Sequence, residues 1–140
     1  MILLQSLLAF IAIFAFAAVS YAPKRQYFFC GLCGGLAWGT CCFLEMLGID
    51  KILSVLFATF FLTVFSSTLS ILQKTPVTIY LMTGVLPLVP GAGIYYTSYY
   101  FIMNEANTAA HMGLDAFKTA GAISLGIIFG FAVPILHLRK

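Results

Sequence analysis

The sequence predicts an all-α membrane protein with five transmembrane helices, the fourth of which is broken at a midplane Pro-Gly segment. Hydrophobic residues make up 62% of the 140 residues and charged residues only 8%, against about 45–50% and about 25% in soluble domains. The apolar residues form five runs long enough to cross a bilayer, whose core needs about 20 residues. This composition excludes a soluble enzyme, a disordered chain and a nucleic-acid-binding protein.

Short polar connections separate the five runs, which we expect to form one integral membrane domain over residues 1–140. The first run also resembles a secretory signal peptide, but it lacks a positive n-region and Pro23 would follow the cleavage site. Residues 104–115 are expected to be a polar loop with weakly helical character, and the helix of the fifth span could begin before residue 119. The predicted spans cover residues 2–21, 27–48, 52–72, 77–103 (interrupted at 87–93) and 119–138.

Basic residues are distributed unevenly between the two sides of this predicted topology. One side carries five basic residues and no acidic residue: Lys24, Arg25, Lys74, Arg139 and Lys140. The opposite side carries two basic residues and every carboxylate: Lys51, Lys118, Glu45, Asp50, Glu105 and Asp115. Because cytoplasmic loops are enriched in Lys and Arg, the N-terminus is predicted outside and the C-terminus in the cytoplasm.

All four cysteines lie in the second run, at Cys30, Cys33, Cys41 and Cys42. The Cys30-x-x-Cys33 spacing could mark a metal or redox pair. A zinc site needs four converging ligands, however, and here a single apolar helix would supply all of them. We therefore interpret the cysteines as small packing residues and predict no metal, no cofactor and no catalytic residue.

Small residues recur every four positions in two of the predicted spans. This spacing places them on one helix face, where another helix can approach closely. We expect these faces to pack helices inside the bundle or between subunits. The first face consists of Gly31, Gly35 and Gly39, and the second of Ala122, Gly126 and Gly130.

The third span carries a row of hydroxyl side chains on one face. Such hydroxyls can bond to their own helix backbone, so each one alone is tolerated in lipid. An aligned row has two readings that remain open, hydrogen bonding between helices or the lining of a polar path. The row consists of Thr59, Thr63, Ser66 and Ser70.

The fourth span contains the most distinctive pattern, Pro87, Pro90, Gly91 and Gly93 within seven residues. Proline disturbs the helical hydrogen bonds and glycine leaves helical geometry at low cost. Two half-helices would then meet at the midplane, offering free carbonyls from one and free N–H groups from the other, as in transporter substrate sites. A simple proline kink is the alternative.

Tyr95 and Tyr96 follow the break at a depth where a phenol hydroxyl needs a partner. We therefore predict that they contact substrate.

Titratable groups are scarce inside the predicted spans. Glu45, near the outer end of the second span, is a possible proton or cation site, and a solvated helix end is the alternative.

The segment Pro87-Leu88-Val89-Pro90-Gly91-Ala92-Gly93-Ile94-Tyr95 resembles the Pro-x-x-Pro-Gly-x-x-x-Tyr segment of the threonine/serine exporter (ThrE) family. In span order and length the chain is similar to the short, split form of that family, the YjjB-like small subunit. The resemblance implies a non-enzymatic subunit of a secondary exporter in the bacterial inner membrane, surrounded by lipid. It would move threonine, serine or related small organic acids.

The resemblance also implies a larger membrane subunit, because the family's His-Gly and Arg-Val-Glu motifs are absent from this chain. A homo-oligomer, including a small channel of identical chains, remains open. So does a scaffold role, in which the chain stabilises a larger transporter without transporting. An intramembrane enzyme would need a nucleophile with a base, or a metal set, at depth, and the sequence shows neither.

Overall fold

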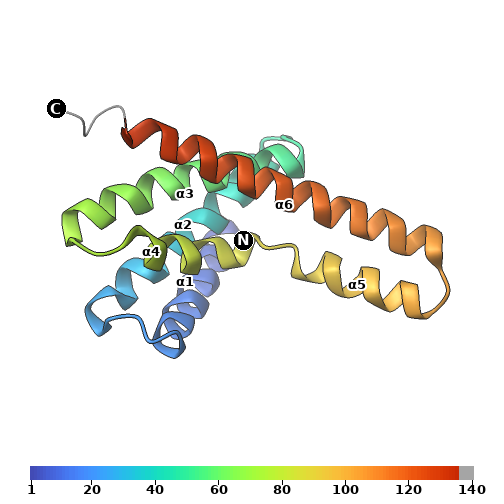
Figure 1. Ribbon diagram of the computed structural model, residues 1–140, viewed down its shortest axis with the longest axis horizontal. Helices are drawn as coiled ribbons and strands as arrows, with labels where there is room; N and C mark the ends of the chain where they lie inside the picture. Colours follow the sequence, from blue (N-terminus) through green and yellow to red (C-terminus); the bar gives the residue numbers. More distant parts are fainter. Residues whose placement is uncertain (136–140) are drawn as a thin grey trace.

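The structure is a computed structural model that describes residues 1–135, with side chains described over residues 1–133. The described part is built from helices alone (Figure 1). Arg139, Lys140 and the predicted end of the last span lie outside the described residues. In chain order the helices are α1 (Ile2–Val19), η1 (Lys24–Gln26), α2 (Tyr27–Met46), α3 (Lys51–Gln73), α4 (Val77–Val85), η2 (Leu86–Leu88), α5 (Gly91–Ile102) and α6 (Ala106–Ile135).

Four segments are each long and apolar enough to cross a membrane: Ile2–Val19, Lys24–Met46, Lys51–Gln73 and Ala106–Val133. The pair Val77–Leu88 and Gly91–Ile102 meets the same criteria together, with a bend of 51° between its halves. The structure therefore confirms an all-α fold with four potential membrane spans, or five if the bent pair crosses the membrane as one broken span.

Helices α1 and α2 form an antiparallel hairpin that is held together at the first glycine face. Gly31 and Gly35 lie against Phe10, and Gly39 lies against Ser6. A Cβ atom added at Gly35 would lie 3.1 Å from the Ser6 carbonyl oxygen and 3.2 Å from Phe10 Cβ. The missing side chains thus allow close approach of the two backbones, the effect expected of this spacing.

Helices α3 and α6 pack through the second glycine face. Gly126 lies against Thr59 and Gly130 against Thr63, so the helices run parallel with a constant offset of 67 residues. A Cβ atom at Gly126 would lie 2.6 Å from the Leu56 carbonyl oxygen. By the same offset, Lys118 of α6 is level with Lys51 at the start of α3.

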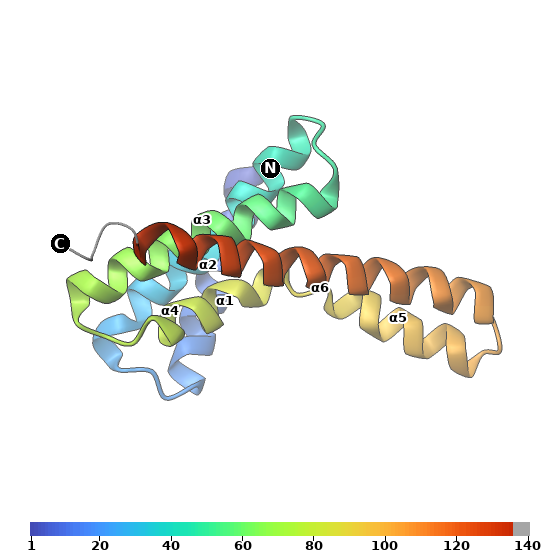
Figure 2. The ribbon, with the colours of Figure 1, turned by 45° about the horizontal axis from the view of Figure 1, so that its top comes forward.

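Helices α4 and α5 belong to different parts of the molecule. Helix α4 packs on α2 and α3, with Gly84 against Leu62 and Cys33. Helix α5 packs mainly on α6, where Gly93 lies against Ala116. We call α5 with residues 106–120 of α6 the arm, and the remainder the body. Figure 2 shows the arm projecting from the body as a two-helix hairpin.

Two predicted boundaries need correction. Residues 104–115 are mostly helical, because α6 begins at Ala106 and not near 119. The Ala-rich start is a good helix former, and the Glu105 carbonyl accepts the Ala109 N–H at 3.0 Å. The break is also shorter than 87–93, since Gly91 and Gly93 already belong to α5. Proline fixes the break at residues 86–90, where it removes two backbone donors.

Candidate functional site

The break between α4 and α5 exposes backbone groups that a continuous helix would pair. Gly91 N–H donates to the Val89 carbonyl at 2.8 Å, and Ile94 N–H donates to the Pro90 carbonyl at 3.1 Å. Helix α5 has no side-chain cap, so the intervening N–H groups of Ala92 and Gly93 remain available. These groups and the positive end of the α5 dipole suit a carboxylate or another anion.

The break runs from near the middle of α3 toward its start. Gly84 contacts Leu62, the midpoint of α3, whereas Gly93 contacts Ala116, which by the offset of 67 residues is level with residue 49, just before α3 begins. Leu88 is buried, whereas Val89 and Gly91 are exposed. The change from buried to exposed residues therefore falls inside the break, between Leu88 and Val89.

A groove runs beside the break, between α5 and α6, with a volume of about 540 Å³. Its inner end is formed by Val89 and Pro90. Hydroxyl groups from both helices reach into a mainly apolar surface. The remaining lining residues are Ile94, Thr97, Ser98, Gly113, Ala116, Phe117, Ala120, Ile123 and Ser124. We call this the arm groove.

The hydroxyl groups of the arm groove all donate to their own helices. Thr97 Oγ1 bonds the Gly93 carbonyl at 2.7 Å, Ser98 Oγ bonds the Ile94 carbonyl at 3.2 Å and Ser124 Oγ bonds the Ala120 carbonyl at 3.0 Å. Each oxygen keeps acceptor capacity for a donor in the groove. The groove thus offers acceptors, and the start of α5 offers donors.

Tyr95 and Tyr96 do not line the arm groove. Tyr95 is 64% exposed and Tyr96 is 46% exposed. Tyr95 stacks on Tyr99 with ring centroids 6.4 Å apart, and Tyr96 stacks on Tyr100 at 6.3 Å. The sequence analysis missed Thr97 and Ser98, whose hydroxyls were less conspicuous than four neighbouring tyrosines.

The predicted hydroxyl row of α3 lies inside the body. Thr59 donates to the Val55 carbonyl at 2.8 Å and Thr63 donates to the Thr59 carbonyl at 2.7 Å, while the glycines of α6 cover both. Ser66 Oγ lies 3.8 Å from Cys33 Sγ, and Ser70 donates to the Thr75 carbonyl at 2.5 Å. The row thus faces α6 at one end and the start of α4 at the other.

A buried polar cluster, which the sequence analysis did not find, ties the basic end of the body together. Gln26 Nε2 donates to Thr75 Oγ1 at 3.2 Å, and the Tyr80 hydroxyl donates to Gln26 Oε1. Gln26 and Tyr80 are buried. The cluster joins the loop after α1, the loop after α3 and α4. It therefore brings Lys24, Arg25 and Lys74 to the same end.

Cys30, Cys33 and Cys42 of α2 each contact a different neighbouring residue, and not one another. Cys30 Sγ lies 3.9 Å from the Ile79 carbonyl oxygen, and Cys33 contacts Ser66. Cys42 Sγ lies 3.5 Å from Gln5 Oε1 of α1. Among the described residues, no three His, Cys, Asp or Glu side chains converge in a way that could hold a metal ion.

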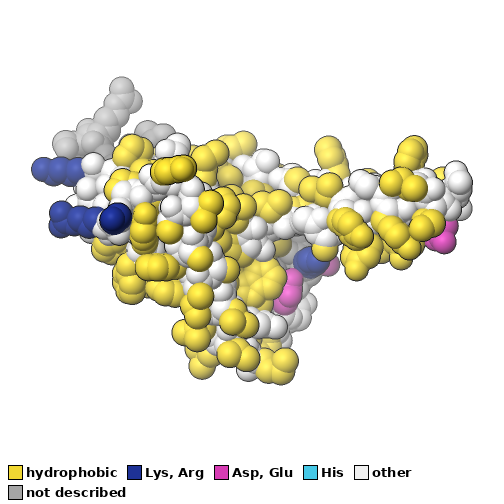
Figure 3. All heavy atoms as spheres, turned by 90° about the horizontal axis from the view of Figure 1, so that it is seen from below, with side chains coloured by type: hydrophobic (Ala, Val, Ile, Leu, Met, Phe, Trp, Pro, Cys, Tyr) yellow, Lys and Arg dark blue, Asp and Glu magenta, His cyan; other side chains and the backbone are white. Residues whose placement is uncertain are grey.

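The acidic residues lie away from the basic end. Figure 3 shows most of the visible Lys and Arg side chains gathered at one end of the molecule, and the carboxylates toward the arm and beside a further basic side chain near its base. Glu45 is exposed and lies 3.9 Å from Cys41 Sγ.

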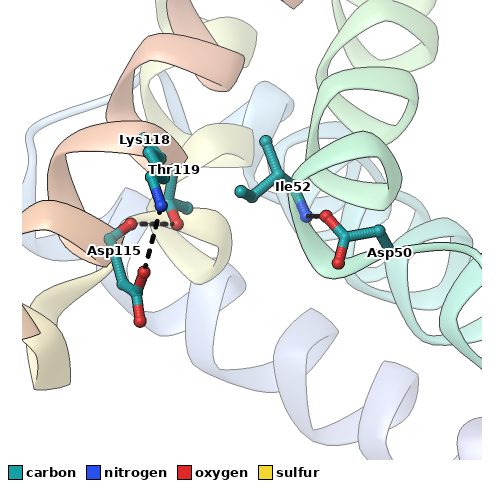
Figure 4. Close-up of polar contacts among 5 residues, drawn as sticks. All are labelled: Asp50, Ile52, Asp115, Lys118 and Thr119. Atoms are coloured by element: carbon teal, nitrogen blue, oxygen red, sulfur yellow. Dashed lines mark hydrogen bonds and ion pairs between the residues drawn. The ribbon is translucent and has the colours of Figure 1, made fainter. Parts of the chain in front are cut away.

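Charged side chains also mark the start of α3 and the middle of α6, both drawn in Figure 4. Asp50 accepts the Ile52 N–H at 3.3 Å and so caps α3. On α6, Lys118 pairs with Asp115 at 3.8 Å, and Thr119 donates to the Asp115 carbonyl at 2.8 Å.

Apolar spanning helices, a broken span with free backbone groups and an adjacent groove define a polytopic membrane protein of the transporter class. The sequence matches the family described as "Threonine/Serine exporter, ThrE" over residues 5–133. The chain therefore belongs to the threonine/serine exporter family, which is a family of membrane transport proteins.

A curated relative supports the same assignment. The "Probable threonine/serine exporter" of Mycobacterium tuberculosis (strain ATCC 25618 / H37Rv) is 26% identical over 112 residues, which are 79% of this chain and 21% of the relative. The chain thus spans about a fifth of the length of that relative. No solved structure matches the chain.

Proposed function

We propose that the chain is one subunit of a secondary exporter that moves threonine, serine or related small organic acids out of the cell. The observation that carries this proposal is the broken span of a chain in the threonine/serine exporter family. A zwitterionic amino acid would place its carboxylate at the free N–H groups of Ala92 and Gly93. Its ammonium and hydroxyl groups would meet the hydroxyl acceptors of the arm groove.

The proposal includes a larger membrane subunit, because the matched residues make up only 21% of the curated relative. It also places the chain in the bacterial inner membrane with the N-terminus outside. The shared basic end formed by Lys24, Arg25 and Lys74 supports a cytoplasmic location for that end. A single cysteine at position 107 should then react with an impermeant thiol reagent from outside only, and reaction only from inside would reverse the topology.

Substitution Gly91→Leu tests the transport site. A Cβ at Gly91 would meet no atom within 4 Å, so the protein should insert and assemble normally. The leucine side chain would cover the free N–H groups at the start of α5, and efflux should be abolished. The assay is efflux of labelled threonine or a labelled dicarboxylate from vesicles that contain this chain and the larger subunit.

Substitution Gly121→Leu is the matched control, because its Cβ also meets no atom within 4 Å and Gly121 lies outside the arm groove. Normal efflux by Gly91→Leu at equal protein level would remove the break from the mechanism. The non-transporting scaffold role would then explain the chain better.

A further inference from the structure

The arm is incomplete as a packing unit. None of the α5 residues is buried, whereas α2 and α3 each bury a continuous face. In the arm, α5 packs mainly on α6, and the arm groove lies exposed between the two helices. A third element is needed to bury this surface.

Lipid is a poor occupant for the inner end of the arm groove. Val89 and Pro90 form that end, where the backbone is irregular and its polar groups lack helical partners. Irregular backbone at membrane depth is tolerated only where protein or water covers it. Lipid tails offer no hydrogen-bonding group to the N–H groups of Ala92 and Gly93.

The outward face of α1 provides the contrast within the same chain. Leu4, Leu8 and Ile11 are all more than half exposed there, and the α1 helix is unbroken. That face is apolar and suits lipid. The two exposed surfaces therefore differ in chemistry, and the arm groove alone combines small residues, hydroxyl groups and a broken backbone.

A second copy of the chain fits the arm groove badly if it presents its own groove, because two hollow surfaces placed face to face leave the space between them unfilled. Gly113, Ala116 and Ala120 form a floor of small residues that instead suits the ridge of one helix.

We propose that the arm groove is the docking site for a transmembrane helix of the larger exporter subunit. This inference rests on the proposed function, and the size of the curated relative supports it, since four-fifths of that exporter lies outside the matched region. The docked helix would present bulky apolar side chains to the groove floor and a hydrogen-bonding side chain to the break. The transport path near the break would then be walled by both subunits.

Photo-cross-linking in host membranes tests the docking site. Benzoylphenylalanine placed at Ser98, inside the groove, should form an adduct with the membrane protein that matches the uncovered part of the curated relative. Mass spectrometry identifies the adduct. The same probe at Leu8 on α1 is the control and should capture lipid only.

An adduct of two copies of this chain would overturn the proposal in favour of a homo-oligomer. Lipid adducts alone at Ser98, with the larger subunit present, would also overturn it. A protein adduct of equal yield at Leu8 would show that capture is unspecific and would contradict a dedicated groove.

Substitution Ala120→Leu supplies a second measurement. Ala120 lines the groove but is exposed, so a leucine there should leave the fold intact while blocking the docked helix. Co-purification of the larger subunit should fall about tenfold or more, since overpacking at a well-fitted contact is costly. Ala110→Leu, exposed on the same helix outside the groove, should leave co-purification unchanged.

These measurements separate the docking site from the proposed function. If efflux depends on the chain while Ser98 and Ala120 variants show no effect on the partner, the transport role stands and the docking site falls. If the larger subunit docks as described but efflux does not require the chain, the docking site stands and the transport role falls.

Discussion

The body and the arm both consist of apolar helices, but the helices pack differently in the two regions. In the body, glycines bring helices into backbone contact, and every buried side-chain N or O atom of the described residues has a hydrogen-bond partner. In the arm, two helices leave a groove and free backbone groups uncovered. The difference teaches that the body buries its helix contacts within the described residues, whereas the arm leaves a groove between its two helices exposed.

The largest expected effect lies in the contact between α3 and α6. Gly126→Leu would drive a side chain into the Leu56 carbonyl and Thr59, which belong to a helix backbone that cannot yield. The free energy of unfolding should fall by about 3 kcal/mol, the upper part of the usual overpacking range. Unfolding in detergent, compared with Gly121→Leu, measures it. Equal stability of the two variants would contradict the α3–α6 packing.

The contact between α1 and α2 should be the next most sensitive. Gly35→Leu places a side chain against Ser6 and Phe10 and should cost about 1–3 kcal/mol. Helix α1 should separate from α2. A short bifunctional thiol reagent should join Cys42 to a cysteine introduced at Gln5, its neighbour in the structure, and lose this reaction in the Gly35→Leu variant. Retained cross-linking would mean that this face of α2 looks at lipid.

Tyr80→Phe examines the polar cluster of the body. The substitution leaves the buried Gln26 Oε1 without its donor. An unsatisfied buried acceptor costs about 1–3 kcal/mol, so the melting temperature in detergent should fall clearly. Unchanged stability would show that water replaces the lost hydroxyl and that the basic end is open to solvent.

Tyr95→Phe is the matched change in the arm and should have the smallest effect. Tyr95 is mostly exposed and has no hydrogen-bond partner among the described residues, so stability should stay within about 0.5 kcal/mol of the parent. If its hydroxyl contacts substrate, the apparent affinity for threonine in the efflux assay should fall by no more than about tenfold, since one hydrogen bond contributes about 0.5–1.5 kcal/mol. A loss of stability as large as that of Tyr80→Phe would remove the distinction between body and arm.

Periodicity predicted the close approach at both glycine faces but not the partner helices. Spacing along one helix shows which residues share a face, whereas the choice of α1 for Gly35 and α3 for Gly126 depends on how the whole chain packs. The broken span was predictable because Pro87 and Pro90 act locally. Its exact length was not, since Gly91 and Gly93 belong to α5, where Gly93 packs against Ala116 of α6.

The two missed features have the same physical origin. The low hydropathy of residues 104–115, caused by their polar side chains, predicted a loop. In the structure Gly113 contacts Thr97, and the segment packs as a helix on α5. Gln26 lies between two predicted spans beside Lys24 and Arg25, yet it is buried and contacts residues distant in sequence. Hydropathy describes the medium that a residue prefers, and it does not show which segments fold back to cover it.

Helix α6 passes without interruption from the body into the arm. A small tilt of this continuous helix in the body therefore becomes a larger displacement at its start. Its fixed point is the contact of Gly126 with α3, and its free end at Ala106 lies 20 residues away, about 30 Å at the usual helical rise. A tilt of about 10° about the fixed point would displace the free end by about 5 Å. Rearrangements at the break that are too small to disturb the body would therefore produce a larger displacement at the start of α6, where a label at position 107 could report them.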